Sequence, residues 1–358
     1  MRQILPADHA DVAIVLGELC RCHLAFGNIP EATRMAEDSV SVVMSTCNRD
    51  DRIVAELVSC LANCYLSAGK TAEAIKLYEE CAETFRKYLP DTLLFLCNSL
   101  YQLAKHYASN GMLQKSSSLL EEVIDFYRSF RYDFHPRLNQ ALYMLGLNYL
   151  KTDKVVDAEN VLRQSLLICE TISPESFECI AALRGLEKSL IMQNRYVECL
   201  PLLLQLRNIV AKKFPSMSKE IANAFLQLGE CCLKLLQLEE AEKAFSVSIE
   251  IYSTILPADD SDMRKAVKAL VLLGSLYEEK GDFRKATELY KQSLNTLQQI
   301  PLIYVDTANV LKKATNCLWK QQDFVEMLPF LLTLRELHAQ KAAASVAMVE
   351  SEYITTSR

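Results

Sequence analysis

The stretch that decides the fold is LANCYLSAGKTAEAIKLY, residues 61–78. Its apolar residues recur three, four and seven positions apart on either side of Gly69, a spacing typical of two helices that each bury one stripe. Gly69 suits the turn between them, because glycine adopts a left-handed backbone at little cost and so ends one helix before another begins. A second copy, LGSLYEEKGDFRKATELY at residues 273–290, indicates that this helical hairpin recurs along the chain.

The hairpin recurs on a period of about 42 residues. One frame, anchored on the turn between the two helices, places a Gly, Asp or Asn at seven of eight anchors and a leucine at the remaining one. The eight anchors are Gly27, Gly69, Gly111, Asp153, Asn194, Leu236, Gly281 and Asp323. Self-similarity at a fixed period of this length indicates a repeat protein, in which each unit buries its apolar face against its neighbours.

Three further positions of the frame carry residues of characteristic size. Five residues after the anchor the side chain is small, as at Ala74, and four residues later it is a large apolar plug, as at Tyr78. Four residues before the anchor it is mostly aromatic, from His23 to Trp319. The small residue lets the two helices approach closely, because a bulky side chain there would overpack their contact.

The frame weakens at three places. Glu187 occupies a position of the first helix where glycine or alanine is usual, and Leu236 replaces the expected turn residue. Leu328 replaces the small residue of the last hairpin. We expect the array to bend or deviate at these positions.

Composition excludes several classes of protein. A chain of 358 residues exceeds the size of one compact core, and the absence of a Pro- or Gly-rich linker favours a continuous array over separate domains. A net charge of −6 argues against a general nucleic-acid or anionic-membrane binder. Thirteen cysteines, without a signal-like segment, indicate reduced thiols in the cytosol. No apolar stretch approaches the roughly 18 residues that cross a bilayer, so we expect no membrane insertion.

The pattern of residues 61–78 and 273–290 resembles that of tetratricopeptide repeats, over roughly residues 8–338. The period is longer than the usual repeat of about 34 residues. In this respect, and in the spacing of His135-Pro136, Gly146 and Tyr149, the chain is similar to kinesin light chains. The resemblance implies an all-α fold, a right-handed superhelical α-solenoid of about eight helix-turn-helix repeats.

The predicted array covers residues 1–339. Its repeats are expected at approximately 8–45, 52–87, 94–130, 137–172, 178–213, 220–254, 265–299 and 305–338. Residues 340–358 lose the frame, and we expect them to extend the last helix into a frayed tail.

The sequence predicts no catalytic, cofactor or metal site. Gly69-Lys70-Thr71 resembles the end of a phosphate-binding loop, but Cys64 stands where that loop needs its first glycine. Cys60 and Cys64 lie one helical turn apart, yet no second Cys/His pair follows at zinc spacing, so we interpret them as core thiols. The five histidines are too scattered to propose a catalytic triad.

Charged residues near the turns are interpreted as solvated surface. Acidic pairs such as Glu79-Glu80 and Glu121-Glu122 fall on helices beside lysines. Lysines such as Lys70 follow the small-residue turns, where charge is expected on an exposed loop.

A stack of such hairpins lines an extended concave groove with its first helices, and this groove is the usual binding surface of solenoids. By the geometry of the family, the ninth positions of the first helices are Arg21, Asn63, Lys105, Leu147, Lys188, Glu230, Ser275 and Cys317. With neighbouring positions, the candidate peptide-groove residues are Arg21, Asn63, Asn98, Tyr101, Lys105, Lys151, Arg184 and Lys188.

The resemblance implies that such a lining holds acidic or carboxylate-ending peptides. Arg and Lys pair with carboxylates, and Asn side chains hold the peptide backbone. The alternative is that these are ordinary solvent-facing helix positions. In the later repeats, Leu226, Leu233, Val271 and Leu272 indicate either an apolar section of the groove, suited to an amphipathic helix or a leucine-anchored peptide, or a tighter contact within the array.

We therefore expect a non-catalytic scaffold or adaptor that binds peptide segments of partner proteins in the concave groove. One alternative is a structural subunit of a large ciliary, centrosomal or trafficking assembly, and another is a motor-cargo adaptor related to kinesin light chain. The expected partners are proteins, not nucleic acids, and the expected location is the cytoplasm, with cytoskeletal or ciliary association as a variant.

Overall fold

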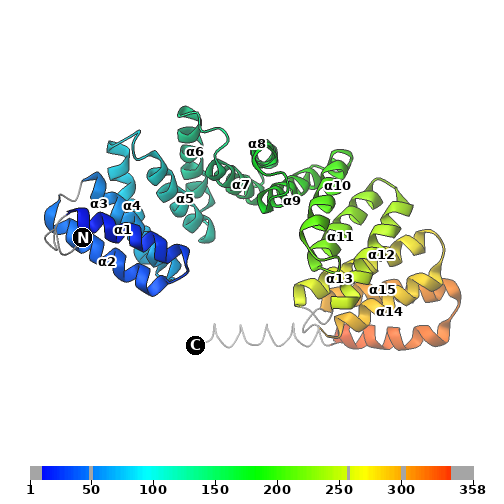
Figure 1. Cartoon of the computed structure of the whole chain (residues 1–358). Helices are drawn as coiled ribbons and strands as arrows, with labels where there is room; N and C mark the ends of the chain where they lie inside the picture. Colours follow the sequence, from blue (N-terminus) through cyan, green and yellow to red (C-terminus); the bar gives the residue numbers. More distant parts are fainter. Residues whose placement is uncertain (1–9, 48–50, 256–258, 300–303, 340–358) are drawn as a thin grey trace, which may run out of the picture. The chain divides into compact units, whose positions relative to one another are not determined.

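The structure is a computed structural model that describes residues 10–47, 51–255, 259–299 and 304–339. Throughout these ranges every regular element is a helix, and the chain forms two compact units, Met1–Gln193 and Asn194–Arg358 (Figure 1). The division falls inside the fifth predicted repeat. The predicted tail, 340–358, lies outside the described residues.

Unit 1 is built from helical hairpins. Its described helices are α1 (Ala10–Ala25), α2 (Ile29–Thr46), α3 (Arg52–Ser67), α4 (Thr71–Lys87), α5 (Leu93–Ser109), α6 (Leu113–Ser129), α7 (Pro136–Lys151), α8 (Val155–Ile172) and α9 (Phe177–Met192). Each helix packs against the next, and the first helices α1, α3, α5, α7 and α9 also contact one another in order. They therefore form one continuous layer, as the predicted α-solenoid requires.

Unit 2 follows the same plan. Its described helices are α10 (Tyr196–Lys213), α11 (Lys219–Lys234), α12 (Leu238–Ile255), α13 (Asp260–Glu279), α14 (Phe283–Leu297) and α15 (Tyr304–Gln321), followed by a helix over residues 324–339. Neighbouring helices pack in sequence here too, and α11 also contacts α13. The all-α solenoid predicted from the sequence is thus present in each unit. None of the described helices combines the length and apolar character needed to cross a membrane.

The turns inside the hairpins share one backbone conformation. The anchor residue is left-handed, with φ of 80° at Gly69. In this turn the Lys70 N–H donates to the Tyr65 carbonyl over 2.8 Å, and the Gly69 N–H donates to the Leu66 carbonyl over 3.2 Å. The pair of bonds satisfies carbonyls that the end of the first helix would otherwise leave unpaired.

Leu236 adopts this conformation although it is not a turn residue. Its φ is 58°, and the Gln237 N–H donates to the Cys232 carbonyl over 2.9 Å. The Leu236 side chain is 81% exposed, so its packing does little to offset the unfavourable backbone conformation. The turn at Leu236 is regular, contrary to the deviation expected there.

The last anchor is Gln322, and the prediction of Asp323 was wrong by one residue. Gln322 has a φ of 61°, whereas Asp323 caps the following helix with its carboxylate. The shift brings Leu318 into the core in place of Trp319, which is 61% exposed. With Gln322 as anchor, the exposed Leu328 no longer falls on the position five residues after the anchor, where a small residue is expected. Aspartate suits a helix start as well as a left-handed turn, so its type alone did not fix the register.

The plug residues lie over the small residues of the first helices. Tyr78, Phe245 and Tyr290 are fully buried. A Cβ atom added to Gly229 would come within 2.7 Å of the Phe245 ring, and one added to Gly274 would come equally close to Tyr290. The absence of a side chain on these glycines therefore sets how closely the two helices of a hairpin approach.

Tyrosines four residues before the anchors join consecutive hairpins. The Tyr107 hydroxyl donates to the Glu79 carboxylate over 2.9 Å, and the Tyr149 hydroxyl donates to Glu121 over 2.7 Å. Tyr65 makes the corresponding bond to Glu37. These glutamates belong to the second helix of the preceding hairpin, so they have a specific role that the sequence did not reveal.

The lysines beside the turns also have a contact. Lys70 Nζ lies 5.0 Å from the centre of the Tyr65 ring, and Lys154 Nζ lies 5.6 Å from that of Tyr149. A cation over an aromatic face is attracted by the ring's quadrupole. These lysines therefore pack against the joining tyrosines of their own hairpins.

We expect Leu236→Gly to stabilise unit 2. A non-glycine residue in the left-handed conformation destabilises the folded state by about 1–2 kcal/mol. Glycine removes this strain, but it also raises the conformational entropy of the unfolded chain, so the free energy of unfolding should rise by about 0.5–1 kcal/mol. Urea unfolding followed by circular dichroism should show a higher midpoint. Lys234→Gly, an exposed change within α11, is the control and should lower the midpoint. A lower midpoint for both variants would contradict the argument.

Candidate peptide-binding groove

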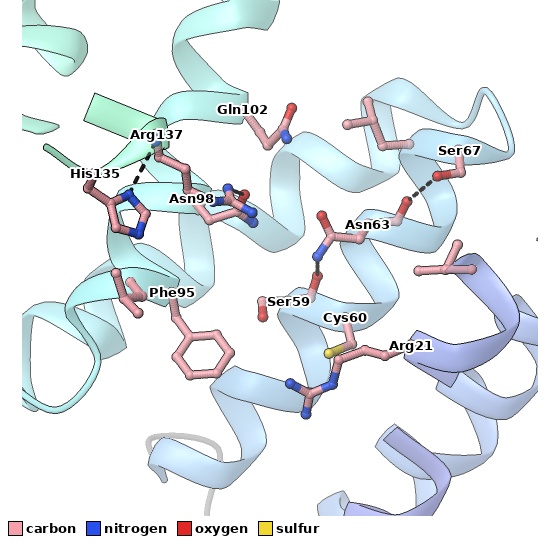
Figure 2. A pocket seen from close by; sticks show the side chains of 13 residues that line it. Arg21, Ser59, Cys60, Asn63, Ser67, Phe95, Asn98, Gln102, His135 and Arg137 are labelled. Atoms are coloured by element: carbon pink, nitrogen blue, oxygen red, sulfur yellow. Dashed lines mark hydrogen bonds between the residues drawn. The ribbon is translucent and has the colours of Figure 1, made fainter. Parts of the chain in front are cut away.

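The first helices of unit 1 line an open cavity of about 580 Å³ (Figure 2). Its walls come from α1, α3, α5 and the start of α7, the layer in which a concave groove was predicted. The cavity brings together three of the predicted groove residues, Arg21, Asn63 and Asn98. Its size falls within the range of roughly 300–1,000 Å³ typical of ligand sites.

Two arginines supply positive charge to the cavity. Arg21 on α1 pairs with Glu18 of the same helix over 2.8 Å. Arg137, near the start of α7, donates to the Asn98 side-chain oxygen. Within the described part of the chain, no carboxylate forms an ion pair with Arg137. Its guanidinium is therefore the stronger candidate for binding a carboxylate from a ligand.

The backbone N–H of Arg137 donates to His135 Nδ1 over 3.2 Å (Figure 2). Burial and the nearby Arg137 charge lower the pKa of His135. A neutral imidazole can accept this hydrogen bond, whereas a protonated one cannot. The imidazole thus caps the start of α7 and helps to fix Arg137 at the cavity wall.

Asn63 is held in one orientation by its neighbours. Its side-chain nitrogen donates to the Ser59 carbonyl over 2.9 Å, and its oxygen accepts from the Tyr78 hydroxyl over 2.8 Å. Tyr78 is the plug of the same hairpin, so the core fixes this groove residue directly. One amide hydrogen of Asn63 stays available, which allows it to donate to a peptide carbonyl.

Cysteines form one side of the cavity and the core beneath it. Cys60 lines the cavity, and the Cys20 and Cys64 sulfurs lie 3.2 Å apart in the same apolar cluster. Burial raises the pKa of Cys60 to about 11. This thiol is therefore protonated at neutral pH, and the charge of the cavity comes from its arginines.

The other predicted groove residues lie outside this cavity. Tyr101 is half-buried against the core of unit 1, and burial raises the pKa of its hydroxyl. Lys105 on α5, Lys151 on α7 and Lys188 on α9 are exposed. Arg184 on α9 is half-buried. The structure thus leaves these residues on the first-helix layer of unit 1 without gathering them into one pocket.

Some sequence-based groove positions belong to the core. Leu226 is buried, and so is Cys317, the supposed ninth position of the last repeat. Because the last anchor is Gln322, the equivalent position is the exposed Asn316. Val271 and Leu272, in contrast, border a cavity in unit 2.

Several lining residues were missed by the sequence analysis. Phe95, Gln102 and Arg137 all face the cavity (Figure 2). Arg137 stands 16 residues before its anchor, at the start of its helix, whereas the groove positions counted from the frame lie nearer the middle. Its role depends on the stacking of α7 beside α5, which the sequence period does not specify in atomic detail.

We expect Cys60 to react slowly with iodoacetamide at pH 8. With a pKa of about 11, only about one Cys60 thiol in a thousand is ionised at this pH, and the thiolate is the reactive form. Mass spectrometry should show alkylation of the exposed Cys22 at least about 100-fold faster, and the rate at Cys60 should rise until about pH 11. Equal rates at pH 8 would contradict the assignment of Cys60 as a buried thiol.

Comparison with known proteins supports the repeat assignment. A family model described as the tetratricopeptide repeat matches residues 53–129 and 220–299. No curated protein sequence matches the chain.

Solved structures show similar folds. A signal transduction ATPase with a tetratricopeptide repeat sensor from Pyrococcus horikoshii has a TM-score of 0.61 at 15% identity, over 95% of this chain and 49% of that one. BtubC from P. vanneervenii has a TM-score of 0.53 at 15% identity, over 64% of this chain and 92% of that one. The nearly identical repeats of a Podosopora anserina kinesin light chain have a TM-score of 0.48 at 25% identity, over 57% of this chain and 97% of that one.

The family match covers hairpins in both units, and the fold similarity extends across nearly the whole chain. Left-handed turns, small residues and buried plugs recur at the positions that the repeat frame assigns. The chain therefore contains tetratricopeptide repeats, matched at residues 53–129 in unit 1 and 220–299 in unit 2.

Proposed function

We propose that this protein is a non-catalytic scaffold that binds peptide segments of partner proteins in the first-helix groove of unit 1. The observation that carries the proposal is the cavity that Arg21, Asn63, Asn98 and Arg137 line. Such a lining offers charge-assisted hydrogen bonds to a carboxylate and amide contacts to a peptide backbone. A peptide with acidic side chains or a free carboxyl terminus fits this chemistry best.

The contacts of Arg137 and Asn98 give the groove a specific anchor. Their side chains are hydrogen-bonded to each other across α5 and α7, so both are positioned before a ligand arrives. Such preorganisation lowers the entropic cost of binding. A ligand carboxylate would meet Arg137 together with the amide nitrogen of Asn98.

Other basic residues extend the proposed surface along unit 1. Lys105, Lys151 and Lys188 are exposed on α5, α7 and α9, the same helices that continue the groove layer. Exposed charges of this kind mainly speed association and select partners, and salt screens them. The proposal therefore assigns them a supporting role beside the cavity.

One observation favours the alternative role as a subunit of a large assembly. Phe130, Tyr132 and Phe134, in the loop between α6 and α7, are exposed large side chains that are not among the residues lining the cavity. Clustered exposed aromatic residues mark interaction surfaces on many proteins. A scaffold can use both surfaces, so the two roles are compatible.

We expect Arg21→Glu/Arg137→Glu to weaken capture of groove-dependent partners. Loss of a charge-assisted hydrogen bond costs about 1.5–3 kcal/mol, so the double change should weaken binding at least about 10-fold. Affinity purification with quantitative mass spectrometry measures the loss, and tiled peptides from the recovered proteins locate the bound segments. Arg207→Glu/Arg335→Glu, with the same change in charge in unit 2, is the matched control.

The double change Lys105→Glu/Lys188→Glu tests the extended surface separately. It should weaken binding by a smaller factor and reduce its dependence on salt. Unchanged partners and affinities in both groove variants would refute the proposed function. Retained binding after the acidic residues of the tiled peptides are replaced by glutamine would refute the proposed peptide chemistry.

A further inference from the structure

Unit 2 contains a second cavity with a different lining. It lies along α13 and α15 and measures about 610 Å³. Its apolar surface includes the buried Val267 and Val310 and the half-buried Val271 and Leu272. An accessible trough of valine and leucine side chains favours burial of apolar groups from a ligand.

Basic residues border this trough. Arg264, Lys268, Lys312 and Lys313 line the cavity, and among the described lining residues Asp306 is the one acidic side chain. The excess of positive charge is local, because the whole chain has a net charge of −6. An acidic ligand is therefore attracted to this part of the surface and a basic one is repelled.

Two of these cations are free to meet a ligand. Lys268 pairs with Glu230 over 2.6 Å, and Lys313 donates to the Ser275 hydroxyl over 2.9 Å. In the described ranges of the chain, Arg264 and Lys312 form no ion pair, and both side chains are exposed. A ligand carboxylate can bind them without breaking a contact within the protein.

The spacing of the lining residues defines the shape of the ligand. On α13 they lie at positions 264, 267, 268, 271 and 272, and on α15 at 306, 309, 310, 312 and 313. Steps of three and four residues place each set on one face of its helix, over a length of about 12 Å at 1.5 Å per residue. About two turns of another helix fit along such a trough.

We propose that the α13–α15 trough is a second docking site, which binds a short amphipathic helix of a partner protein with an apolar stripe flanked by carboxylates. The stripe would occupy the surface formed by Val271, Leu272 and Val310, and the carboxylates would meet Arg264 and Lys312. Helices that lie in apolar grooves present anchors at such three- and four-residue intervals. The site goes beyond the proposed groove function, since it lies in unit 2 and recognises an apolar helical stripe in addition to carboxylates.

The test uses three labelled dodecapeptides and the full chain. The acidic probe EELEELLEELLE places its leucines on one helical face. KKLKKLLKKLLK keeps this stripe and reverses the charge, whereas LELEELELEELE keeps the composition and disperses the leucines. Fluorescence anisotropy gives the affinity of each probe. We expect the acidic probe to bind at least about 10-fold more tightly than either of the others.

Two variants locate the bound probe. Val271→Asp places a charge in the apolar trough and should weaken binding of the acidic probe at least about 10-fold. Lys312→Glu changes an exposed side chain, so it leaves folding intact and should weaken binding about 3- to 10-fold. Lys234→Glu, an exposed change on α11 outside the cavity, is the matched control and should bind like the unaltered chain. Circular dichroism confirms that each variant is folded.

The outcomes separate this site from the groove of unit 1. Full binding of the acidic probe by the Arg21→Glu/Arg137→Glu variant supports a site in unit 2, whatever becomes of the groove proposal. Unchanged binding in Lys312→Glu and in folded Val271→Asp would overturn the inference, as would equal affinity for all three probes. Binding only after removal of residues 340–358 would also overturn it, since the occupant would then be the chain's own segment.

Discussion

The contact between a plug side chain and a small residue of the facing helix is the constraint on which the rest of this structure depends. A Cβ atom on Gly229 would approach the Phe245 ring to 2.7 Å. Because glycine has no Cβ atom, α11 and α12 can pack at their observed distance. The same contact decides which face of each first helix is buried and which remains for ligands. Asn63 shows the link directly, because the plug Tyr78 holds its side chain in the groove.

The two units share this helical packing but differ in the residues that line their cavities. In unit 1, α3, α5 and α7 present amides and an arginine around one cavity, a polar lining suited to extended backbone and carboxylates. In unit 2, α13 and α15 present valines and leucine bordered by cations. Because a repeat needs only its small, turn and plug positions to fold, its exposed positions are free to carry either chemistry.

The sequence predicted the fold in considerable detail because the residues that recur with its period are those required by the turns and by the contacts between helices. Gly, Ala and aromatic positions recur wherever the backbone or the interhelical contact demands them, and hairpins form there. Leu236 was harder, since the surrounding hydrogen bonds impose a left-handed turn on a residue that does not prefer it. Candidate sites were less predictable. Arg137 reaches the cavity only through the stacking of neighbouring hairpins, and Glu79 bonds a tyrosine 28 residues away, so neither role leaves a local signature.

The tyrosine joints have a consequence for how the chain is made. Tyr65, Tyr107 and Tyr149 each reach back 28 residues to the hairpin just completed, so every joint closes as soon as the next first helix exists. Contacts of such short sequence separation favour rapid folding. A nascent chain can therefore add one hairpin at a time as it leaves the ribosome, with each finished hairpin serving as the template for the next.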